Sequence, residues 1–537
     1  MKLVTVQEMR TIEQQANAGG WSYEQMMDKA GQGVAKEILT RFADHKKTII
    51  GLVGSGNNGG DTLVALGTLA KQGWITFAYQ VKPRSEDDAL LKWFLQCGGT
   101  AFSMNQDKNF CKLEEWIKDS SVLLDGVLGT GIELPLKPEV ASLLKFVSSM
   151  KDLPTVVAVD CPSGVDCNTG EAAAECIPAD LTLCMAAIKI GLLNFPASQL
   201  VGEMGVIDIG LPKKLESWAG INREVVNSDE VRKVLPERPM DANKGTFGTA
   251  MIAAGSINFM GAAYLAGSAA YRIGAGLVKL AVPEILATTL AGNIPEATWL
   301  ILPDEMGVIS DTASEVLLGN LQKVSALLLG PGWGLEETTG HFLEAILKNK
   351  RDPSKAKRVG FLDAEESKPV STKGGLPPLI IDADGLKHLS HIKDWSKVLP
   401  PESILTPHPG EMAFISGKTV TEIQANRIEV AQEYSKLWKV ILVLKGANTV
   451  VAEPGGMVKV IPISSPALAK AGTGDALAGI ITGLRAQGLS AFDSAWAGAW
   501  IHARAGVLAA KLIGTTASVL SSEVIQSIPK VFSELSY

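Results

Sequence analysis

The sequence has no excess of positive charge. Its 537 residues include 50 Lys and Arg against 57 Asp and Glu, which gives a formal net charge of -7. Such a chain offers no overall positive field to nucleic acid phosphates or anionic lipid, so we expect neither nucleic acid nor a membrane as a partner. A small anionic ligand would need local hydrogen-bond donors instead.

Long apolar runs are also lacking. Residues 1–15 alternate polar and apolar side chains and contain no apolar core of a secretory signal. The most apolar helical stretch, residues 495–514, is interrupted by His502, Arg504 and Lys511, which would be costly at bilayer depth. We therefore interpret this stretch as a core helix and expect a cytoplasmic protein.

Cysteine is scarce and confined to one part of the chain. The six cysteines are Cys97, Cys111, Cys161, Cys167, Cys176 and Cys184. No two of them have the CxxC spacing of a zinc or redox site, so we expect free thiols in a reducing compartment. Their absence after residue 184 favours two joined domains, and the chain also exceeds the size of one hydrophobic core.

The hydrophobic pattern predicts an α/β fold in two domains. Short β-branched runs alternate with amphipathic segments up to about Pro212, which is typical of a parallel sheet with helices on both faces. Residues 213–243 are polar and rich in proline, and we assign them as a linker. The pattern restarts over residues 244–537, where residues 351–375 form a polar excursion between elements.

A glycine-rich turn, GLVGSGNNGGD, covers Gly51 to Asp61 between a predicted strand and a predicted helix. Free backbone N–H groups and the helix dipole at such a turn attract phosphate. Asn57 and Asn58 favour this function, because amides supply both donors and acceptors. The alternative is a tight turn without a ligand.

Polar residues follow two further predicted strands. Asp125 lies in LLDGVLGTG, and Asp160 and Ser163 lie in VVAVDCPSGVD. Because the carboxyl ends of parallel strands meet at one edge of a sheet, we expect these side chains near the asparagines. A carboxylate, an amide oxygen and a hydroxyl suit a hard cation, and a second carboxylate could shuttle a proton. The alternative for each aspartate is a helix or turn cap.

Together with KIGLLNFP and GVIDIGLP, these motifs resemble the NAD(P)H-hydrate epimerase family over Met1 to Pro212. The resemblance implies a Rossmann-like three-layer sandwich, with Asp160 as the acid/base. It implies a potassium ion, K+, held by Asn58, Asp125 and Ser163. It assigns the hydrated nucleotide to Asn57, Asn58, Gly59, Gly60, Asp61, Gly129, Thr130, Gly131, Ile132, Glu133, Leu134, Pro135 and Asp160.

A second glycine turn, AGTGDALAG, opens a predicted helix near the C-terminal end and carries Asp475 in the first turn. Its backbone N–H groups could form an anion hole, with Asp475 placed to take a proton from a hydroxyl that attacks a phosphate. The alternative for Asp475 is a helix cap.

With NKGTFG, GPGWG, DADGL, TPHPGE and KGANT, this turn resembles the ribokinase-like NAD(P)H-hydrate dehydratase family from about Asn227 to Tyr537. The resemblance implies a ribokinase-like α/β domain with Asp475 as the base, and ADP with Mg2+ as the phosphoryl donor. It assigns substrate binding to Ala262, Gly332, His408 and Asp475, and nucleotide binding to Lys445, Gly446, Ala447, Asn448, Thr449 and Gly474. His408 could instead hydrogen-bond the backbone at its strand end.

The joint resemblance implies repair of damaged nicotinamide nucleotides. The first domain would interconvert the S and R epimers of hydrated NADH and NADPH, and the second would dehydrate the S form at the expense of ADP. We also expect a homo-oligomer. The closest alternative is a ribokinase-type kinase of a small hydroxymethyl heterocycle, with the first domain as a ligand-binding or scaffold module. The sequence leaves open the choice between the two cofactors and between ADP and ATP.

Overall fold

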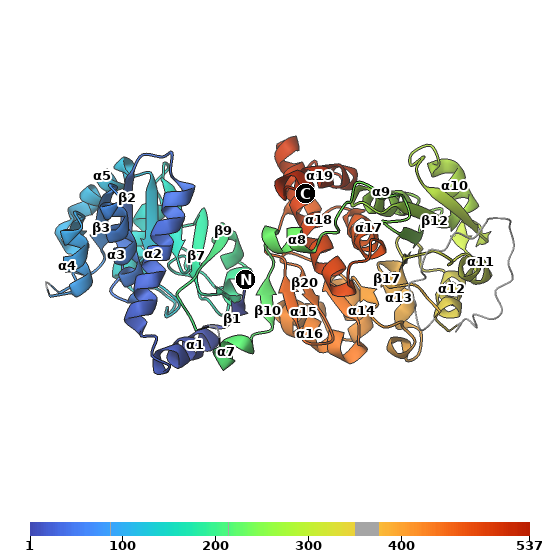
Figure 1. Ribbon diagram of the computed structural model, residues 1–537, viewed down its shortest axis with the longest axis horizontal. Helices are drawn as coiled ribbons and strands as arrows, with labels where there is room; N and C mark the ends of the chain where they lie inside the picture. Colours follow the sequence, from blue (N-terminus) through green and yellow to red (C-terminus); the bar gives the residue numbers. More distant parts are fainter. Residues whose placement is uncertain (86, 213, 349–374) are drawn as a thin grey trace. The chain divides into compact units, whose positions relative to one another are not determined.

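The computed structural model describes residues 1–85, 87–212, 214–348 and 375–537 (Figure 1). The chain divides into two compact units, Met1–Arg223 and Glu224–Tyr537. This division falls within the 213–243 segment that the sequence analysis assigns as a linker. The predicted polar excursion at residues 351–375 lies outside the described residues except for Gly375.

A seven-stranded parallel sheet forms the centre of the first unit. Its strand order is β4-β3-β2-β5-β6-β7-β9. The strands are β2 (Thr48–Val53), β3 (Ile75–Gln80), β4 (Thr100–Ser103), β5 (Val122–Gly126), β6 (Thr155–Val159), β7 (Leu181–Met185) and β9 (Glu203–Ile207). A separate parallel pair joins β1 (Leu3–Val4) to β8 (Ile188–Lys189).

Helices cover both faces of this sheet. They are α1 (Val6–Ala18), α2 (Tyr23–Arg41), α3 (Asn57–Lys71), α4 (Ala89–Gln96), α5 (Cys111–Asp119), α6 (Pro138–Ser148) and the short α7 (Glu216–Ala219). Alternate strand residues separate two cores: Ile49 packs with α1 to α4, whereas Ile50 packs with α5 and α6. The period-2 alternation of the strands therefore builds the expected three-layer α/β sandwich, which is confirmed.

The second unit has a ten-stranded sheet in the order β10-β21-β20-β19-β18-β17-β16-β11-β12-β13. Its strands are β10 (Arg223–Val225), β11 (Thr249–Ala253), β12 (Leu277–Pro283), β13 (Thr298–Leu302), β16 (Ala326–Leu329), β17 (Leu379–Ile381), β18 (Ile404–Leu405), β19 (Ile441–Leu444), β20 (Val450–Ala452) and β21 (Val458–Val460). The pairs from β19 to β13 are parallel, and those of β20 with β19 and β21 are antiparallel. An antiparallel hairpin, β14 (Asp304–Glu305) and β15 (Val308–Ile309), stands apart.

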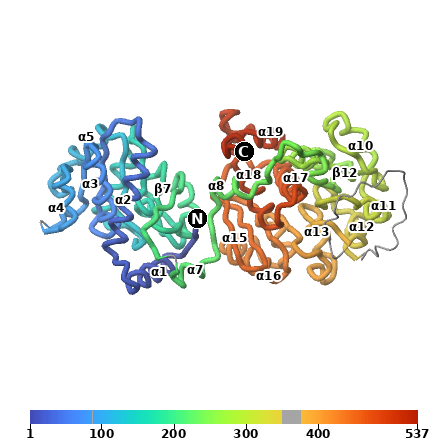
Figure 2. Tube along the Cα trace, viewed as in Figure 1, coloured from blue at the N-terminus to red at the C-terminus, as the bar shows by residue number. Residues whose placement is uncertain are grey.

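The α-helices of this unit are α8 (Ser228–Val234), α9 (Gly261–Arg272), α10 (Glu284–Leu290), α11 (Ala313–Gly319), α12 (Glu337–Lys348), α13 (Asp384–Ser390), α14 (Pro409–Ser416), α15 (Val420–Ala425), α16 (Arg427–Trp438), α17 (Thr473–Ala486), α18 (Ala491–Ile513) and α19 (Ser521–Glu534). Figure 2 traces the chain through α7 into α8 and onward to α19. Helices α9, α17, α18 and α19 share one core with the sheet. The second α/β fold is thus also confirmed.

Helices α9 and α17 pack very closely. A Cβ atom on Gly479 of α17 would lie 2.2 Å from the carbonyl oxygen of Ala266 in α9. Glycine is therefore required here, because any side chain would force the two backbones apart.

The apolar stretch predicted as a core helix is α18, and most of it is buried in that core. Burial lowers the pKa of His502 in this helix to about 4, so its ring is neutral at pH 7. Among the described helices, none combines the length and apolar character that a bilayer crossing needs. All six cysteines are free thiols, and Cys161, Cys167, Cys176 and Cys184 are buried.

Candidate active sites

The first candidate site begins at the amino end of α3. The turn after β2 leads to Gly56 as the N-cap residue, and no side chain caps the helix. Its first backbone N–H groups therefore lack a side-chain acceptor. Gly59 allows the helix to approach the turn, since a Cβ there would lie 2.0 Å from the carbonyl oxygen of Gly54. Asn57 is exposed beside this end and Asn58 is buried.

Asp125, Ser163 and Asn58 meet below this turn. Ser163 donates to the fully buried Asp125 carboxylate twice, from Oγ to Oδ1 at 2.5 Å and from its backbone N to Oδ2 at 2.8 Å. Ser163 Oγ also accepts a hydrogen bond from Leu128 N, and Asn58 Nδ2 donates one to Leu128 O, each at 2.8 Å. The structure therefore places Asn58, Asp125 and Ser163 around one loop.

This cluster has an oxygen atom that the protein itself does not satisfy. Asn58 Oδ1 is buried and has no hydrogen-bond partner among the described residues. Burial raises the pKa of Asp125 even though the Ser163 hydrogen bonds oppose that rise. Within the described part of the chain, no lysine or arginine forms an ion pair with Asp125. One carboxylate with neutral oxygens fits a monovalent cation better than magnesium, which prefers strict octahedral geometry.

The segment from Gly129 to Pro135 continues from β5 along the surface. Gly131, Glu133, Leu134 and Pro135 are exposed, and the other members are partly buried. A Cβ on Gly129 would lie 3.5 Å from the Asn58 side chain. The structure therefore brings the start of this segment to the α3 site and leaves most of it open to solvent.

Asp160 follows β6 with a left-handed backbone, φ = 68°. Its Oδ1 accepts hydrogen bonds from the Met185 backbone N at 2.9 Å and from Lys189 Nζ. Lys189 side-chain exposure is 1%, against 14% for Asp160. Lys189 is the first residue of the KIGLLNFP motif, and the motif alone predicts no role for it.

Two further carboxylates face this ion pair. Burial raises the pKa of Asp61 well above its ordinary value, and repulsion from Asp160 and Glu13 adds to the rise. Burial also raises the pKa of Glu13, although the Lys189 ammonium opposes this. One buried ammonium thus serves Asp160, Asp61 and Glu13, which come from three different elements. The Asp61 and Glu13 carboxyl groups therefore hold a proton more readily than ordinary carboxyl groups.

The second candidate site lies at the amino end of α17. Gly472 caps this helix with φ = 87°, and no side chain bonds its first N–H groups. Asp475 lies in the first turn. Burial raises the pKa of Asp475 to about 7, and repulsion from Asp382 adds to the rise against the attraction of Lys445. Such a carboxyl can both accept and release a proton near neutral pH.

Lys445 connects the acidic residues around Asp475. Its Nζ lies 2.7 Å from Asp382 Oδ1 and 3.5 Å from Glu411 Oε2. Burial disfavours the ammonium, but the attraction of Asp382 and Glu411 raises the pKa of Lys445 above its ordinary value. A Cβ on Gly474 would lie 3.5 Å from this Nζ. Two predicted nucleotide ligands, Lys445 and Gly474, are therefore neighbours.

Asp382 was quoted in DADGL without a role, and the structure places it in this network. Its Oδ1 accepts a hydrogen bond from Thr406 Oγ1 at 2.6 Å as well as from Lys445. Its Oδ2 is buried and has no hydrogen-bond partner among the described residues. This oxygen atom could bind a ligand, and the sequence alone gives no indication of it.

Hydrogen bonds from Arg427 and Thr449 fix the KGANT loop, which follows β19. Arg427 donates to the carbonyl oxygens of Leu444 and Lys445 at 2.9 and 3.2 Å, and Thr449 Oγ1 donates to Gly446 O at 2.9 Å. Gly446 and Ala447 are exposed and Asn448 is buried. The loop thus presents its glycine and alanine to solvent beside the Lys445 network.

His408 is the N-cap residue of α14. Its Nδ1 accepts from the backbone N–H groups of Gly410 and Glu411 at 3.0 and 3.2 Å. Glu411 returns a bond by accepting from His408 N at 2.8 Å. The backbone role named as the alternative is therefore present, and half of the imidazole stays exposed.

Ala262, in the first turn of α9, and Gly332, in the turn after β16, lie close together. A Cβ on Gly332 would lie 2.6 Å from Ala262 Cβ, and the glycine has φ = 64°. Ser256 Oγ fixes this turn by donating to Gly332 O at 2.9 Å. The structure thus brings the two predicted substrate contacts side by side.

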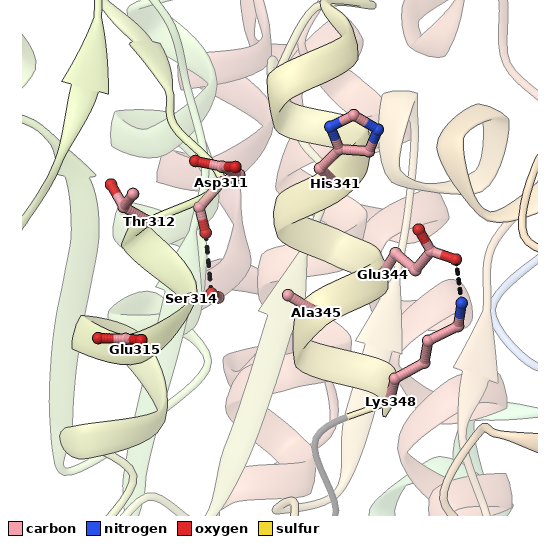
Figure 3. A pocket seen from close by; sticks show the side chains of 8 residues that line it. All are labelled: Asp311, Thr312, Ser314, Glu315, His341, Glu344, Ala345 and Lys348. Carbon is pink, nitrogen blue, oxygen red and sulfur yellow. Dashed lines mark hydrogen bonds and ion pairs between the residues drawn. The ribbon is translucent and has the colours of Figure 1, made fainter.

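A separate hollow between α11 and α12 contains none of the predicted residues (Figure 3). Its lining consists of Asp311, Thr312, Ser314, Glu315, His341, Glu344, Ala345 and Lys348. In the described ranges, no three His, Cys, Asp or Glu residues are arranged to hold a metal ion. We therefore assign this hollow no role.

Comparison with known proteins covers both units. The family model described as NAD(P)H-hydrate dehydratase matches residues 250–365 and 368–530. The model described as YjeF-related protein N-terminus matches residues 23–191.

Similar proteins match over nearly the whole chain. A bifunctional NAD(P)H-hydrate repair enzyme of Moorella thermoacetica is 32% identical over 547 residues, covering 100% of this chain and 97% of the relative. Its namesake in Salinibacter ruber is 33% identical, covering 95% and 92%. A crystal structure of the ADP/ATP-dependent NAD(P)H-hydrate dehydratase from Bacillus subtilis, co-crystallised with ATP and Mg2+, is 28% identical. It covers 59% of this chain and 100% of its own, with a TM-score of 0.47.

Proposed function

The chain belongs to the family of bifunctional NAD(P)H-hydrate repair enzymes, and on this premise we propose that each unit carries one of two linked repair reactions. The first epimerises hydrated NADH and NADPH, and the second dehydrates the S epimer at the expense of ADP. The epimerase domain comprises residues 1–212 and the dehydratase domain residues 244–537. The segment 213–243, expected to be a linker, contributes α7 to the first unit and β10 and α8 to the second. The alternative kinase of a hydroxymethyl heterocycle lacks support, because repair enzymes match both units.

In the first unit, Asp160 exchanges the proton during epimerisation. The uncapped amino end of α3, with Asn57 to Asp61, binds phosphate of the hydrated nucleotide through backbone N–H groups. The segment from Gly129 to Pro135 contacts the same substrate. Its position beside Asn58 supports this assignment.

Potassium fits the cluster of Asn58, Asp125 and Ser163, because Asn58 Oδ1 lacks a partner among the described residues and Asp125 lacks a paired cation there. When bound, the ion supplies a positive charge that offsets repulsion between Asp125 and the substrate phosphates. Of the three residues only Asp125 carries a charge, because the Asn58 amide and the Ser163 hydroxyl are neutral.

In the second unit, Asp475 acts as a general base on the hydroxyl of the hydrate. It takes the hydroxyl proton while that oxygen bonds to the terminal phosphorus of ADP and the bond from phosphorus to the AMP oxygen breaks. The resulting phosphate ester then loses phosphate and a ring proton, which restores NAD(P)H. This order suits the chemistry, since hydroxide is a poor leaving group and phosphate a much better one. Backbone N–H groups of α17 stabilise the phosphoryl oxygens.

The nucleotide contacts of this unit are Gly474 and the segment from Lys445 to Thr449. The substrate contacts are Ala262, Gly332, His408 and Asp475. Magnesium on the ADP phosphates fits beside Asp382, whose buried Oδ2 has no partner in the described part of the chain. When bound, it neutralises phosphate charge.

The observation that carries this proposal is the recurrence of one arrangement in two units. Each unit has a glycine-rich helix start without a side-chain cap and an acidic side chain, Asp160 directly after β6 in one unit and Asp475 in the first turn of α17 in the other. Six free thiols also support a reducing cytoplasm as the location. The homo-oligomer is a separate proposal, which sedimentation would test.

The decisive assay follows the absorbance of reduced nicotinamide after purified S or R hydrate is mixed with the protein and ADP or ATP. We expect direct recovery from the S epimer and recovery from the R epimer after epimerisation, both with ADP. No recovery from either epimer with either nucleotide would contradict the proposal.

A further inference from the structure

The two oxygen atoms of the Asp160 carboxylate have different surroundings. Oδ1 accepts bonds from Met185 N and from Lys189 Nζ. Among the described residues, Oδ2 has no hydrogen-bond partner. The side chain remains 14% exposed. Oδ1 is thus occupied by the protein, while Oδ2 is the oxygen left for a ligand.

Lys189 is fixed more firmly than an ordinary surface lysine. It comes from β8, which pairs with β1 through Lys189 and Val4. Its Nζ also donates to Met185 O at 3.0 Å, so the same Met185 residue binds the carboxylate through N and the ammonium through O. Burying a charged group costs free energy unless it is paired, and this pairing is directed at Asp160.

The other titratable groups facing this pair come from several elements. They are Glu13 of α1, Asp61 of α3, Cys161 and Cys167 of the loop after β6, and Cys184 of β7. The acidic groups repel the Asp160 carboxylate. Lys189 is the cation that enters the electrostatics of both Asp61 and Glu13 as well as its ion pair with Asp160. Loss of its charge would therefore remove the cation that these acidic groups share, and Glu13 alone would keep a second one, Arg10 of α1.

We infer that Lys189 is a positioning residue for epimerisation, which holds Asp160 through Oδ1 and leaves Oδ2 to exchange a proton with the hydroxyl of the hydrated nicotinamide. The inference rests on the proposed role of Asp160. The hydroxyl stands on the carbon next to the ring nitrogen. When Oδ2 takes its proton, the oxygen forms a carbonyl, the carbon–nitrogen bond breaks and its electron pair stays on nitrogen. Closure on the other face reverses these changes and returns the proton.

The test compares the full-length parent with Lys189→Met and Lys189→Arg. For the methionine variant we expect epimerisation to fall about 10²-fold. The acidic limb of its kcat/KM profile should move to higher pH by about one unit, because a carboxylate that loses a buried cation takes up a proton more readily. Arginine restores the charge, so its acidic limb should return to the parent position.

Thr182→Val is the matched control for disturbance of the sheet. Thr182 is equally buried in β7, and its hydroxyl donates to Val201 O at 2.7 Å. This variant should keep the parent epimerisation rate and profile. Thermal unfolding of the first unit identifies folded variants. If the methionine variant does not fold, the arginine variant decides, and a limb displaced by about one unit would contradict the inference.

Two further results would overturn it. One is epimerisation by Lys189→Met within about threefold of the parent, and the other is a slow variant whose acidic limb has not moved. Asp160→Asn separates this inference from the proposed function. If that variant loses epimerisation while Lys189→Met retains it, only the role of Lys189 fails. If Asp160→Asn retains the parent rate, the assignment of Asp160 itself fails.

Discussion

Burial and nearby charges shift the pKa of individual carboxyl groups in this protein. Asp475 is partly buried near two negative groups, Asp382 and Glu411, that share one ammonium, Lys445. Its pKa of about 7 is a direct result of burial and of that imbalance. An ordinary aspartate would be fully ionised at neutral pH and would be a weaker base.

Dehydration should therefore increase with pH through about 7, as Asp475 loses its proton. Asp475→Asn should lower the rate about 10²- to 10⁴-fold at pH 8, and by less at pH 5 where the parent carboxyl is itself protonated, while ADP binding changes only a few fold. The assay is recovery of reduced nicotinamide from the S epimer, with ADP binding measured by calorimetry. A variant that keeps more than about a third of the parent rate would remove Asp475 from the mechanism.

The same group gives a stability difference with a defined sign. Because folding raises the pKa of Asp475, its contribution to stability is full below pH 3.8 and is lost as pH rises through about 7. Asp475→Asn should accordingly gain stability relative to the parent as the pH rises from 4 to 8, with most of the gain complete by pH 7. Thermal unfolding of the second unit at both pH values measures this gain.

The cation cluster provides a second test at this scale. Replacing potassium by tetramethylammonium at constant ionic strength should slow epimerisation, since the larger ion does not fit the oxygens of Asn58, Asp125 and Ser163. A chelator of divalent ions should have no effect on this step. An unchanged rate without potassium would make the cluster purely structural.

At the scale of elements, the packing of α17 on α9 sets the position of Asp475. Gly479 lies in α17 four residues after Asp475, against the backbone of α9. The register of this contact therefore determines where the first turn of α17 and its N–H groups lie. Small residues in α9, such as Ala266, make the close approach possible.

Gly479→Ala should destabilise the second unit by about 1–3 kcal/mol, because the new methyl group overlaps the Ala266 carbonyl. Gly319→Ala is the control, since a Cβ on Gly319 at the end of α11 meets no atom within 4 Å. Thermal unfolding compares the two variants. Equal stability of Gly479→Ala and the parent would show that the helices separate at little cost.

The sequence predicts several strands and the polar residues at their ends, because each depends only on a short segment of the chain. One of the β-branched runs of the first half, TIIGLV, coincides with β2. Asp125 lies within β5 near its carboxyl end, and Asp160 directly follows β6, so both stand at strand ends as expected. The antiparallel strands β20 and β21 were not predicted. The burial of Lys189 could not be predicted from the sequence, because it depends on Glu13, Asp61 and Asp160, which lie in elements distant in the sequence.

At the scale of the whole molecule, the two candidate sites belong to separate units. Asp160→Asn should lower epimerisation about 10²- to 10⁴-fold without changing dehydration of the S epimer. With a mixture of epimers and ADP, recovery of reduced nicotinamide should then stop while the R epimer remains. Complete conversion at the parent rate would remove Asp160 from the mechanism.

The position of β10 has a consequence for synthesis on the ribosome. The first unit contains all its own strands by Arg223 and can fold as soon as they emerge. By contrast, β10 pairs with β21, and Val226 donates to Val460 O at 3.0 Å, so the two partners are far apart in the sequence. The nascent chain must therefore carry this edge segment without its partner while the intervening strands and helices are being made. Because an unpaired strand can join other chains, a pause in translation before β21 exposes this protein to aggregation.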